Sequence, residues 1–202
     1  MSEKVRCSWA GNSSIYVDYH DNEWGRPVHD DVKLFEMLVL EGMQAGLTWI
    51  TVLKKREAFR EAFDGFDPKL VALYDAAKVQ ELMTNQKIIR NRLKINAAVN
   101  NAKRFLDIVE KYGSFDTFIW QYVNYKPVTG NWTKNEDILP TTPVSDKISN
   151  DLKKLCFKFV GSTIIYAFMQ ATGMVNDHLT KCFTYKELTS PTQLAKTQNQ
   201  TV

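Results

Sequence analysis

Apolar positions recur at helical spacing along most of this chain. Between residues 31 and 43, Leu34, Leu38 and Val39 fall on one face of a helix that begins after a polar pair of aspartates. Similar patterns predict helices over residues 31–43, 47–63, 68–75, 78–84, 93–112, 115–123, 146–155 and 161–172. No segment shows the strict alternation of a half-buried strand, so we expect an all-α fold.

Capping residues support several of these boundaries. Asp67 followed by proline is a strong helix start, because the carboxylate can accept from the first backbone N–H groups and proline fits the first helical position. Ser114 and Ser145 are predicted to cap the helices that follow them, and Gly173 to end the helix before it. Residues 124–142 contain several proline and glycine breakers and are predicted to form the one extended loop.

Composition places the chain among ordinary globular proteins. Of its 202 residues, 44% are hydrophobic and 24% charged, and the net charge of +3 permits nucleic-acid binding without indicating it. We expect a single unit over residues 1–186, built of two closely packed helical subdomains, and a polar, disordered tail over 187–202. Since no stretch is apolar enough for a membrane span or a signal sequence, we expect a cytoplasmic protein without a membrane partner. We also expect the protein to be a monomer.

Two pairs of metal-ligand residues lie at opposite ends of the chain, and the first pair is Cys7 and His20. His178 and Cys182, four positions apart, can face the same side of one helical turn. Either pair alone is more often two ordinary core or surface residues. Together they form a Cys₂His₂ set, whereas the third cysteine, Cys156, has a different apolar context. We therefore predict a structural Zn²⁺, with no position open for water, that ties the first segment of the chain to the last.

Five aromatic residues accompany or follow the first of these pairs: Trp9, Tyr16, Tyr19, Trp24 and Trp49. Aromatic rings at such spacings usually fill a core. The tyrosines, however, lie in a polar stretch, where rings more often line a cleft and keep their polar ends in water. Such a cleft suits a flat heterocycle, and a cationic one best, because several ring faces attract the positive charge.

Glu41 follows three apolar residues and precedes a break marked by two glycines, so its carboxylate is expected to be partly buried. A glutamate on a solvated helix surface is an equal alternative on composition alone. If Glu41 is buried beside the aromatic residues, it becomes a candidate hydrogen-bond acceptor or charge partner for a ligand.

A basic segment containing Lys87, Arg90 and Arg92 joins two of the predicted helices through a short turn. Such a turn can bind a DNA phosphate through the backbone N–H groups that begin the second helix, assisted by cationic side chains. Solvated basic helix faces are an equal alternative. Four further residues would extend a phosphate-facing surface: Lys54, Lys55, Arg56 and Arg60.

Longer motifs connect these residues. They are Tyr19-His-Asp-Asn-Glu-Trp-Gly25, Leu40-Glu-Gly-Met-Gln-Ala-Gly-Leu-Thr-Trp-Ile-Thr-Val-Leu-Lys-Lys-Arg56, Phe157-Lys-Phe-Val-Gly161, Phe168-Met-Gln-Ala and Val175-Asn-Asp-His178. These runs closely resemble the 3-methyladenine DNA glycosylase I family, and the match extends from Cys7 to Cys182 without large gaps. The resemblance implies a helix–hairpin–helix glycosylase fold with an added zinc site.

The resemblance also implies roles by motif position. The zinc ligands would be Cys7, His20, His178 and Cys182, the acidic base-recognition residue Glu41, the pocket tyrosines Tyr16 and Tyr19, the stacking tryptophan Trp49, and further pocket aromatics Trp9 and Trp24. Gly46 and Leu47 match a loop that approaches the gap left by an extruded nucleotide. The hairpin departs from the family pattern, because it has Lys87 and Leu93 where relatives often carry glycine. Cys156, outside the hairpin, also stands where relatives often carry glycine. The added charge of Lys87 is expected to offset part of the loss.

The implied activity is excision of N3-methyladenine from alkylated double-stranded DNA. Methylation makes the base cationic, so it leaves as neutral 3-methyladenine and needs little protonation. Glu41 would accept hydrogen bonds from the adenine edge, and water would capture the sugar cation to leave an abasic site. Two other classes remain open. One is a protein that binds alkylated DNA without excising a base, and the other is a zinc-stabilised helical interaction domain with its aromatic residues in the core.

Overall fold

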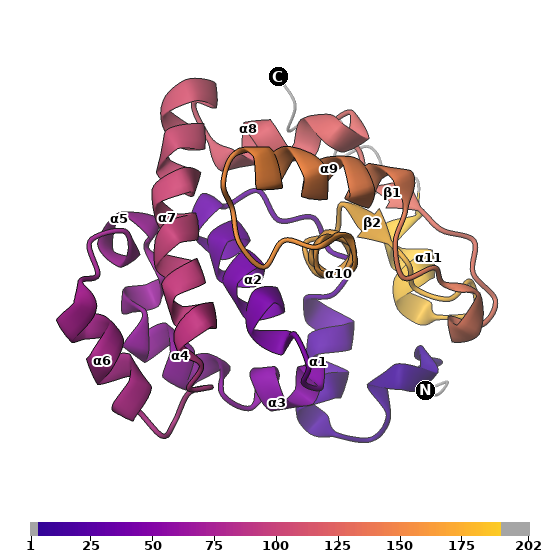
Figure 1. Ribbon diagram of the computed structural model, residues 1–202. Coiled ribbons are helices and arrows are strands. Elements are labelled where there is room, and N and C mark those ends of the chain that lie inside the picture. Colours follow the sequence, from indigo (N-terminus) through magenta and orange to yellow (C-terminus); the bar gives the residue numbers. More distant parts are fainter. Residues whose placement is uncertain (1–3, 191–202) are drawn as a thin grey trace.

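The computed structural model describes residues 4–190, and its core is centred on two helices. Helix α2 (Asp31–Gln44) is buried continuously from Leu34 to Met43 because neighbouring helices cover it on every side. Helix α10 (Ser162–Ala171) packs against it, and Figure 1 places the pair in the middle of the molecule. The all-α prediction is confirmed, since helices dominate the described residues.

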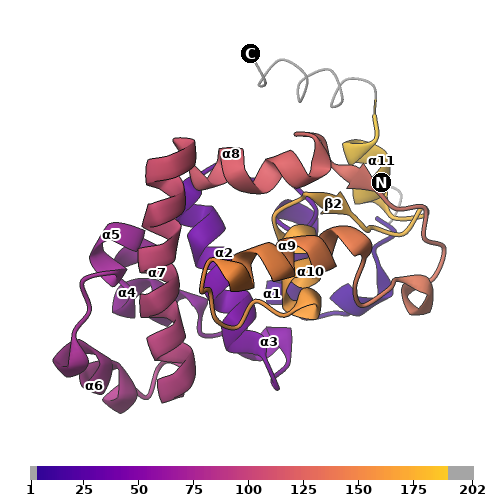
Figure 2. The same ribbon diagram turned by 45° about the horizontal axis from the view of Figure 1, so that its top comes forward.

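The remaining helices surround this pair and are α1 (Ser14–Asn22), α3 (Trp49–Leu53), α4 (Arg56–Ala62), α5 (Pro68–Val71), α6 (Ala76–Thr84), α7 (Arg92–Tyr112), α8 (Phe115–Trp120), α9 (Pro143–Lys154) and α11 (Phe183–Leu188). Short 3-10 turns cover Ser8–Ala10, Asp64–Phe66, Gln121–Val123 and Asn135–Asp137. Helices α4 to α7 form one side of the molecule, and α11 lies on the other (Figure 1). In both views the N-terminal segment lies beside α11 (Figure 2), where the Phe183 N–H donates to the Val5 carbonyl at 2.9 Å.

Several predicted boundaries need correction. The segment 47–63 forms two helices, α3 and α4, which are separated at Lys54 and Lys55. Asp67 caps α5 as predicted, but that helix is only one turn long and ends at Val71. Helix α9 begins three residues before the predicted start, because Thr142 is its cap and Ser145 completes a reciprocal capping box.

Helices α1 and α11 and both short strands escaped the sequence analysis. Helix α1 carries the polar stretch with the two tyrosines. The strands β1 (Val128–Thr129) and β2 (Val175–Asn176) pair in parallel, with Val128 opposite Val175. Gly173, before β2, has φ +68°, and a Cβ there would lie 2.2 Å from the Arg26 carbonyl carbon. Only glycine therefore permits this crossing, which holds the end of α10 against the start of the chain.

The predicted boundary at residue 186 falls inside α11, which continues to Leu188. The rest of the predicted tail, from 191 onward, lies outside the described residues. Among residues 4–190, no helix combines the length and the apolar composition needed to cross a bilayer.

Candidate active site

Four metal-ligand side chains meet where the two ends of the chain come together. The ligand atoms of Cys7, His20, His178 and Cys182 all lie within 4.8 Å of one another, and all four residues are buried. We call this group the Cys–His cluster. The Cys182 Sγ is 3.5 Å from His20 Nε2 and 3.6 Å from His178 Nδ1. The structure thus brings together the full set that the sequence predicted.

The outward nitrogen of each histidine in the cluster has its own partner. The His178 Nε2 donates to the Trp24 carbonyl at 2.9 Å. Its Nδ1 therefore carries no hydrogen and directs its lone pair toward the sulfur atoms. The His20 Nδ1 donates to Asp21 at 2.8 Å and turns Nε2 toward the cluster. Burial opposes ionisation of Asp21, but hydrogen bonds from Arg6 and His20 outweigh it and lower the pKa of its carboxyl.

This arrangement fits a tetrahedral metal ion. Two thiol and two imidazole ligands with their outer nitrogens on a carboxylate and a carbonyl are typical of structural metal sites. The hydrogen bond from Cys7, together with those of the two imidazoles, lowers the pKa of Cys182, so one sulfur is already disposed to the thiolate form that metals bind. The cluster can therefore hold one divalent cation with all its ligands supplied by the protein.

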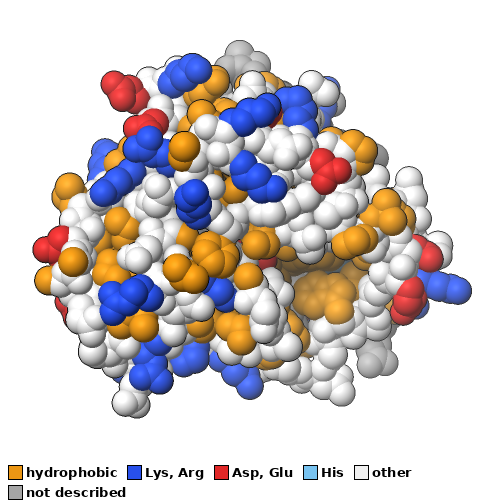
Figure 3. Space-filling view, in the orientation of Figure 1, with side chains coloured by type: hydrophobic (Ala, Val, Ile, Leu, Met, Phe, Trp, Pro, Cys, Tyr) orange, Lys and Arg blue, Asp and Glu red, His pale blue; other side chains and the backbone are white. Residues whose placement is uncertain are grey.

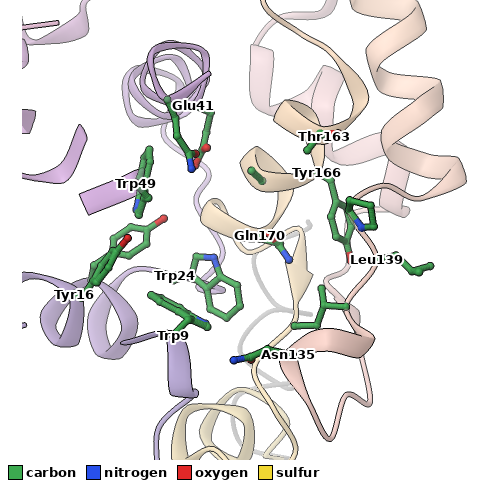
Figure 4. A pocket seen from close by; sticks show the side chains of 15 residues that line it. Trp9, Tyr16, Trp24, Glu41, Trp49, Asn135, Leu139, Thr163, Tyr166 and Gln170 are labelled. Atoms are coloured by element: carbon green, nitrogen blue, oxygen red, sulfur yellow. The ribbon is translucent and has the colours of Figure 1, made fainter. Parts of the chain in front are cut away.

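An aromatic cavity of about 410 Å³ opens beside the cluster. Figure 4 shows Trp9, Tyr16, Trp24 and Trp49 on one side, Tyr166 and Gln170 on the other, and Glu41 entering from α2. In the space-filling view the cavity appears as a hollow with hydrophobic walls (Figure 3). The residues that line it are Trp9, Tyr16, Tyr19, Trp24, Glu41, Gln44, Trp49, Asn135, Ile138, Leu139, Pro140, Thr163, Tyr166, Ala167 and Gln170.

Glu41 is the acidic residue of this cavity. Its exposed fraction is 4%, and its carboxyl makes no hydrogen bond with any residue in the range 4–190. Burial raises the pKa of Glu41 to about 8, so the free protein carries a largely neutral acid here at neutral pH. A buried carboxyl without a partner in a lined cavity is the feature expected of a ligand-binding group.

The two tyrosines of α1 are held by different means. They lie three residues apart on one helical face, which directs both rings toward the cavity. The Tyr16 hydroxyl accepts a hydrogen bond at 3.0 Å from the Ile50 N–H at the start of α3. Burial raises the pKa of Tyr19 well above its usual value, so its hydroxyl stays protonated.

The tryptophans connect the cavity to the cluster. Trp24 meets the His178 ring edge to face at 4.6 Å, and Trp9 meets the His20 ring at 5.3 Å. Trp49 lies on the same side of the cavity, and its indole Nε1 is buried without a hydrogen-bond partner among the described residues. The cavity therefore contains a second buried polar group that a ligand could satisfy.

The hairpin is the turn at residues 85–91 between α6 and α7, together with the first residue of α7. Its predicted DNA-facing residues are all exposed to solvent. Lys87, Arg90 and Arg92 all reach solvent, and Arg92 also donates to Gln80. The Asn91 side chain caps α7 by accepting from the Lys94 N–H at 3.1 Å. This turn therefore presents the positive end of a long helix together with three cations.

The four further basic residues that would extend the phosphate-facing surface are Lys54, Lys55, Arg56 and Arg60, and the prediction is wrong for the two arginines. The Arg56 guanidinium bonds Glu36 and Glu23, both at 2.6 Å. Arg60 bonds Glu36 at 2.9 Å. Lys55 donates at 2.9 Å to the Lys87 carbonyl and so ties α4 to the hairpin. These side chains stabilise the surface beneath the hairpin, whereas Lys54 remains exposed.

Gly46 and Leu47 form a projecting loop between the hairpin and the cavity mouth. Leu47 is 41% exposed despite its apolar side chain, and both residues line a groove that also contains Glu41. Gly46 adopts φ +77°, which favours glycine in this tight turn. Lys and Arg side chains gather on the same face over α3 and the α6–α7 turn, and again along α9 (Figure 3).

A family model described as methyladenine glycosylase matches residues 9–185 of this chain. The chain belongs to the methyladenine glycosylase family. It is 51% identical over 179 residues to DNA-3-methyladenine glycosylase of Haemophilus influenzae, covering 88% of this chain and 96% of that protein. It is 48% identical over 180 residues to DNA-3-methyladenine glycosylase 1 of Escherichia coli, covering 89% and 96%.

The fold agrees with solved structures of the methyladenine glycosylase family. A variant of 3-methyladenine DNA glycosylase I in complex with 3-methyladenine superimposes with a TM-score of 0.87. Its sequence is 38% identical, and the match covers 89% of this chain and 97% of that one. The family match over residues 9–185 therefore includes the hairpin, every residue that lines the aromatic cavity and three of the four residues of the Cys–His cluster.

The sequence analysis missed the cavity wall that faces Glu41 across the opening. Tyr166 and Gln170 share one face of α10, and both bond Asp177, at 2.6 and 2.8 Å. Trp132 donates to the same carboxylate at 2.7 Å. The four-residue spacing on α10 was visible in the sequence, but an apolar helix face gives no sign of whether it meets a core or a cavity.

Proposed function

We propose that this protein excises N3-methyladenine from alkylated double-stranded DNA by hydrolysis and leaves an abasic site. One observation carries the proposal: an aromatic cavity in a member of this family contains the buried, unpartnered carboxyl of Glu41. A cationic purine has the flat shape that the rings accommodate and the charge that a carboxyl can neutralise. The relative found in complex with 3-methyladenine supports the same ligand.

Excision requires the lesion to leave the duplex. The nucleotide would rotate into the cavity, where Trp49 stacks on the base and the tyrosines bound its edge. N3-methylation weakens the glycosidic bond, because the base departs as a neutral molecule. The site therefore has to hold the cationic base and admit water to the sugar, and a strong general acid is unnecessary.

Glu41 is the proposed base-recognition and catalytic residue. Its carboxyl would lose its proton as the cationic base enters, because an adjacent positive charge favours the ionised form. The carboxylate would then accept from the exocyclic amine of adenine. Guanine presents a carbonyl oxygen at the corresponding position, so two acceptors would face each other and the base would be rejected.

The hairpin is the proposed anchor on the DNA backbone. The N-terminus of α7 would bind a phosphate through backbone N–H groups, with Lys87, Arg90 and Arg92 adding charge. Gly46 and Leu47 would occupy the gap that the extruded nucleotide leaves. No lysine lines the described cavity, which supports a monofunctional enzyme without a Schiff-base intermediate.

The proposed ion of the Cys–His cluster is Zn²⁺, with a structural role in a monomeric enzyme. The donor set of two sulfur and two nitrogen atoms favours zinc over the harder divalent cations. With Cys7, His20, His178 and Cys182 all bound, no coordination position would remain for water or substrate. The ion would hold α1, and hence both tyrosines, in place.

Base release from methylated DNA tests the proposal. The wild-type protein is incubated with duplex DNA treated with a methylating agent, and the released bases are separated by chromatography. We expect 3-methyladenine without 7-methylguanine, and a backbone that breaks only after alkali treatment. A protein that binds the methylated duplex and releases no base would instead be a lesion-binding protein, and the proposal would fail.

A further inference from the structure

Lys94 is a buried lysine behind the cavity, in the first turn of α7. It is 8% exposed and is the only buried lysine among residues 4–190. Its ammonium donates to the Met43 carbonyl at 2.8 Å and to the Ala45 carbonyl at 2.6 Å. These carbonyls belong to the end of α2, so the side chain bridges two helices that are far apart in the sequence.

Burying an ammonium group is costly unless it is fully paired, and burial accordingly lowers the pKa of Lys94. The partners explain why the charge is retained. Leu47 donates its N–H to the Gln44 carbonyl at 2.6 Å, which leaves the Met43 carbonyl to the ammonium. Lys94 also faces the negative end of the α2 dipole. The lysine thus terminates α2 and sets where the following loop begins.

Both ends of this bridge lie at proposed contacts with DNA. On the α7 side, the Lys94 N–H is capped by Asn91 in the same turn that would hold a phosphate. On the α2 side, Ala45 is one helical turn beyond Glu41 and directly precedes Gly46 and Leu47. A single side chain therefore connects the phosphate-binding turn to the loop that would fill the gap in the duplex.

We propose that Lys94 is a positioning residue that fixes the loop at residues 45–47 relative to the hairpin, so that hairpin binding sets how far Leu47 enters the DNA. This inference rests on the proposed glycosylase function. Lys94 itself does not line the aromatic cavity, and its donors are directed to carbonyls. Its effect is transmitted through the loop that follows α2.

Other contacts hold α7 without Lys94. The Asn101 amide donates to the Lys158 carbonyl and accepts from the Lys158 N–H, both at 2.8 Å. Asn100 donates to the Cys156 carbonyl at 2.8 Å. These bonds lie further along α7, so replacing Lys94 is expected to release the loop and leave the helix docked.

The test compares Lys94→Met with Lys87→Met, which removes an exposed hairpin charge. Both variants and the wild type are bound to a duplex with a tetrahydrofuran abasic analogue and a neighbouring 2-aminopurine. The fluorescence of 2-aminopurine at saturating protein reports Leu47 insertion, and Leu47→Ala gives the signal without insertion. Single-turnover release of 3-methyladenine and binding of the free base are measured in parallel.

For Lys94→Met we expect a fluorescence change close to that of Leu47→Ala and a single-turnover rate lower by about 10- to 100-fold. Affinity for free 3-methyladenine should stay within about twofold, because the cavity walls are intact, and the salt dependence of DNA binding should be unchanged. For Lys87→Met we expect the salt dependence of DNA binding to fall, with a slope of log affinity against log salt concentration that is smaller by about one. Leu47 insertion should be normal at saturating protein. Lys94→Arg, which keeps the charge and the donors, should recover part of the rate.

Three results for Lys94→Met would overturn the inference. The first is normal Leu47 insertion with a normal rate of base release. The second is a reduced salt dependence of DNA binding, which would indicate a direct phosphate contact, and the third is loss of free-base binding, which would indicate collapse of the cavity. If Lys94→Met loses its circular dichroism signal, the same measurements on Lys94→Gln decide in its place. A wild-type protein that releases no base contradicts the proposed function. Leu47 insertion by that protein would still test the role of Lys94.

Discussion

The Cys–His cluster and the aromatic cavity lie side by side, yet their polar groups are satisfied to opposite degrees. In the cluster each histidine nitrogen has a partner, and Cys7 also accepts from the Leu179 N–H at 3.3 Å. In the cavity Glu41 and the Trp49 indole nitrogen have none among the described residues. The polar groups of the cluster are paired within the protein, whereas these two groups of the cavity are available to a ligand.

This difference separates stability from chemistry. A site whose ligands all come from the protein can contribute fully to folding. Unpartnered groups such as Glu41 cost folding free energy, and that cost is recovered when a substrate binds. Changes to the cluster should therefore affect the fold first, and changes to the cavity should affect catalysis first.

The largest expected effect follows from Cys182→Ala, which removes one ligand of the cluster. We expect the free energy of unfolding to fall by about 4 kcal/mol or more, which corresponds to a fall of about 10 °C in Tm. Metal content should drop below about one zinc per chain. Thermal melting by circular dichroism and elemental analysis measure both.

Cys156→Ala is the matched control, because that cysteine is exposed and is not part of the cluster. It should leave both the Tm and the metal content unchanged. Equal stability of Cys182→Ala and Cys156→Ala would remove the structural role from the cluster.

The second prediction concerns the pH dependence of stability. The pKa of Glu41 is about 8 in the folded protein against an ordinary value of 4.5, so the folded state binds more protons between these values. Stability from this group is present at low pH and is lost as pH rises toward 8. Glu41→Gln removes the loss and should be more stable than wild type by up to about 4 kcal/mol near pH 9, with little difference near pH 4.

Denaturant unfolding of both proteins across this pH range measures the difference. Glu57→Gln is the control, because that carboxylate lies on the surface. A constant offset between wild type and Glu41→Gln at all pH values would mean that Glu41 is not a neutral acid in the folded state.

The third prediction concerns catalysis by the same residue. Glu41→Gln should reduce the single-turnover release of 3-methyladenine by about 100-fold, or about 2.7 kcal/mol, because the amide cannot neutralise the cationic base. Zinc content and fold should be retained. An unaltered rate would remove Glu41 from the chemistry and leave the aromatic rings as the main recognition element.

The smallest effect is expected for Tyr16→Phe, which tests the border between the two regions. The ring remains, but the Ile50 N–H loses its acceptor at the start of α3. We expect a destabilisation of about 1 kcal/mol and a modest loss of base affinity. Chemical denaturation and fluorescence titration with free 3-methyladenine measure the two effects, and a loss of zinc would show that the regions are not separable.

Much of the distinction between the Cys–His cluster and the aromatic cavity could be predicted from the sequence, because the residues of each carry local signals. The four-residue spacing of His178 and Cys182 marked them as a pair of metal-ligand residues, although residues 178–182 form a turn and not a helix. Glu41 lies in a long apolar helix, which made it a candidate buried carboxyl, with a solvated position as an equal alternative. The resemblance of the motifs then indicated the ligand. Assignment of individual residues to base and DNA contacts stays a prediction.

The parts that were not predicted depend on contacts between distant segments. Arg56 looks like a DNA-facing cation in sequence, and only its approach to Glu36 and Glu23 shows that it is an internal ion pair. The break between α3 and α4 coincides with Lys55, whose ammonium reaches the carbonyls of the hairpin. Periodicity describes a helix face and carries no information about which neighbour covers it.

The Cys–His cluster also fixes the order of events during protein synthesis. Cys7 and His178 are 171 positions apart, and His20 and Cys182 are 162 apart. A ribosome must therefore translate nearly the whole described chain before the second pair of ligands emerges. Until then the cluster residues near α1 lack their partners from the far end of the chain. A nascent chain that ends before His178 contains α2 but lacks half of the Cys–His cluster, so it cannot complete the link between the two ends of the protein.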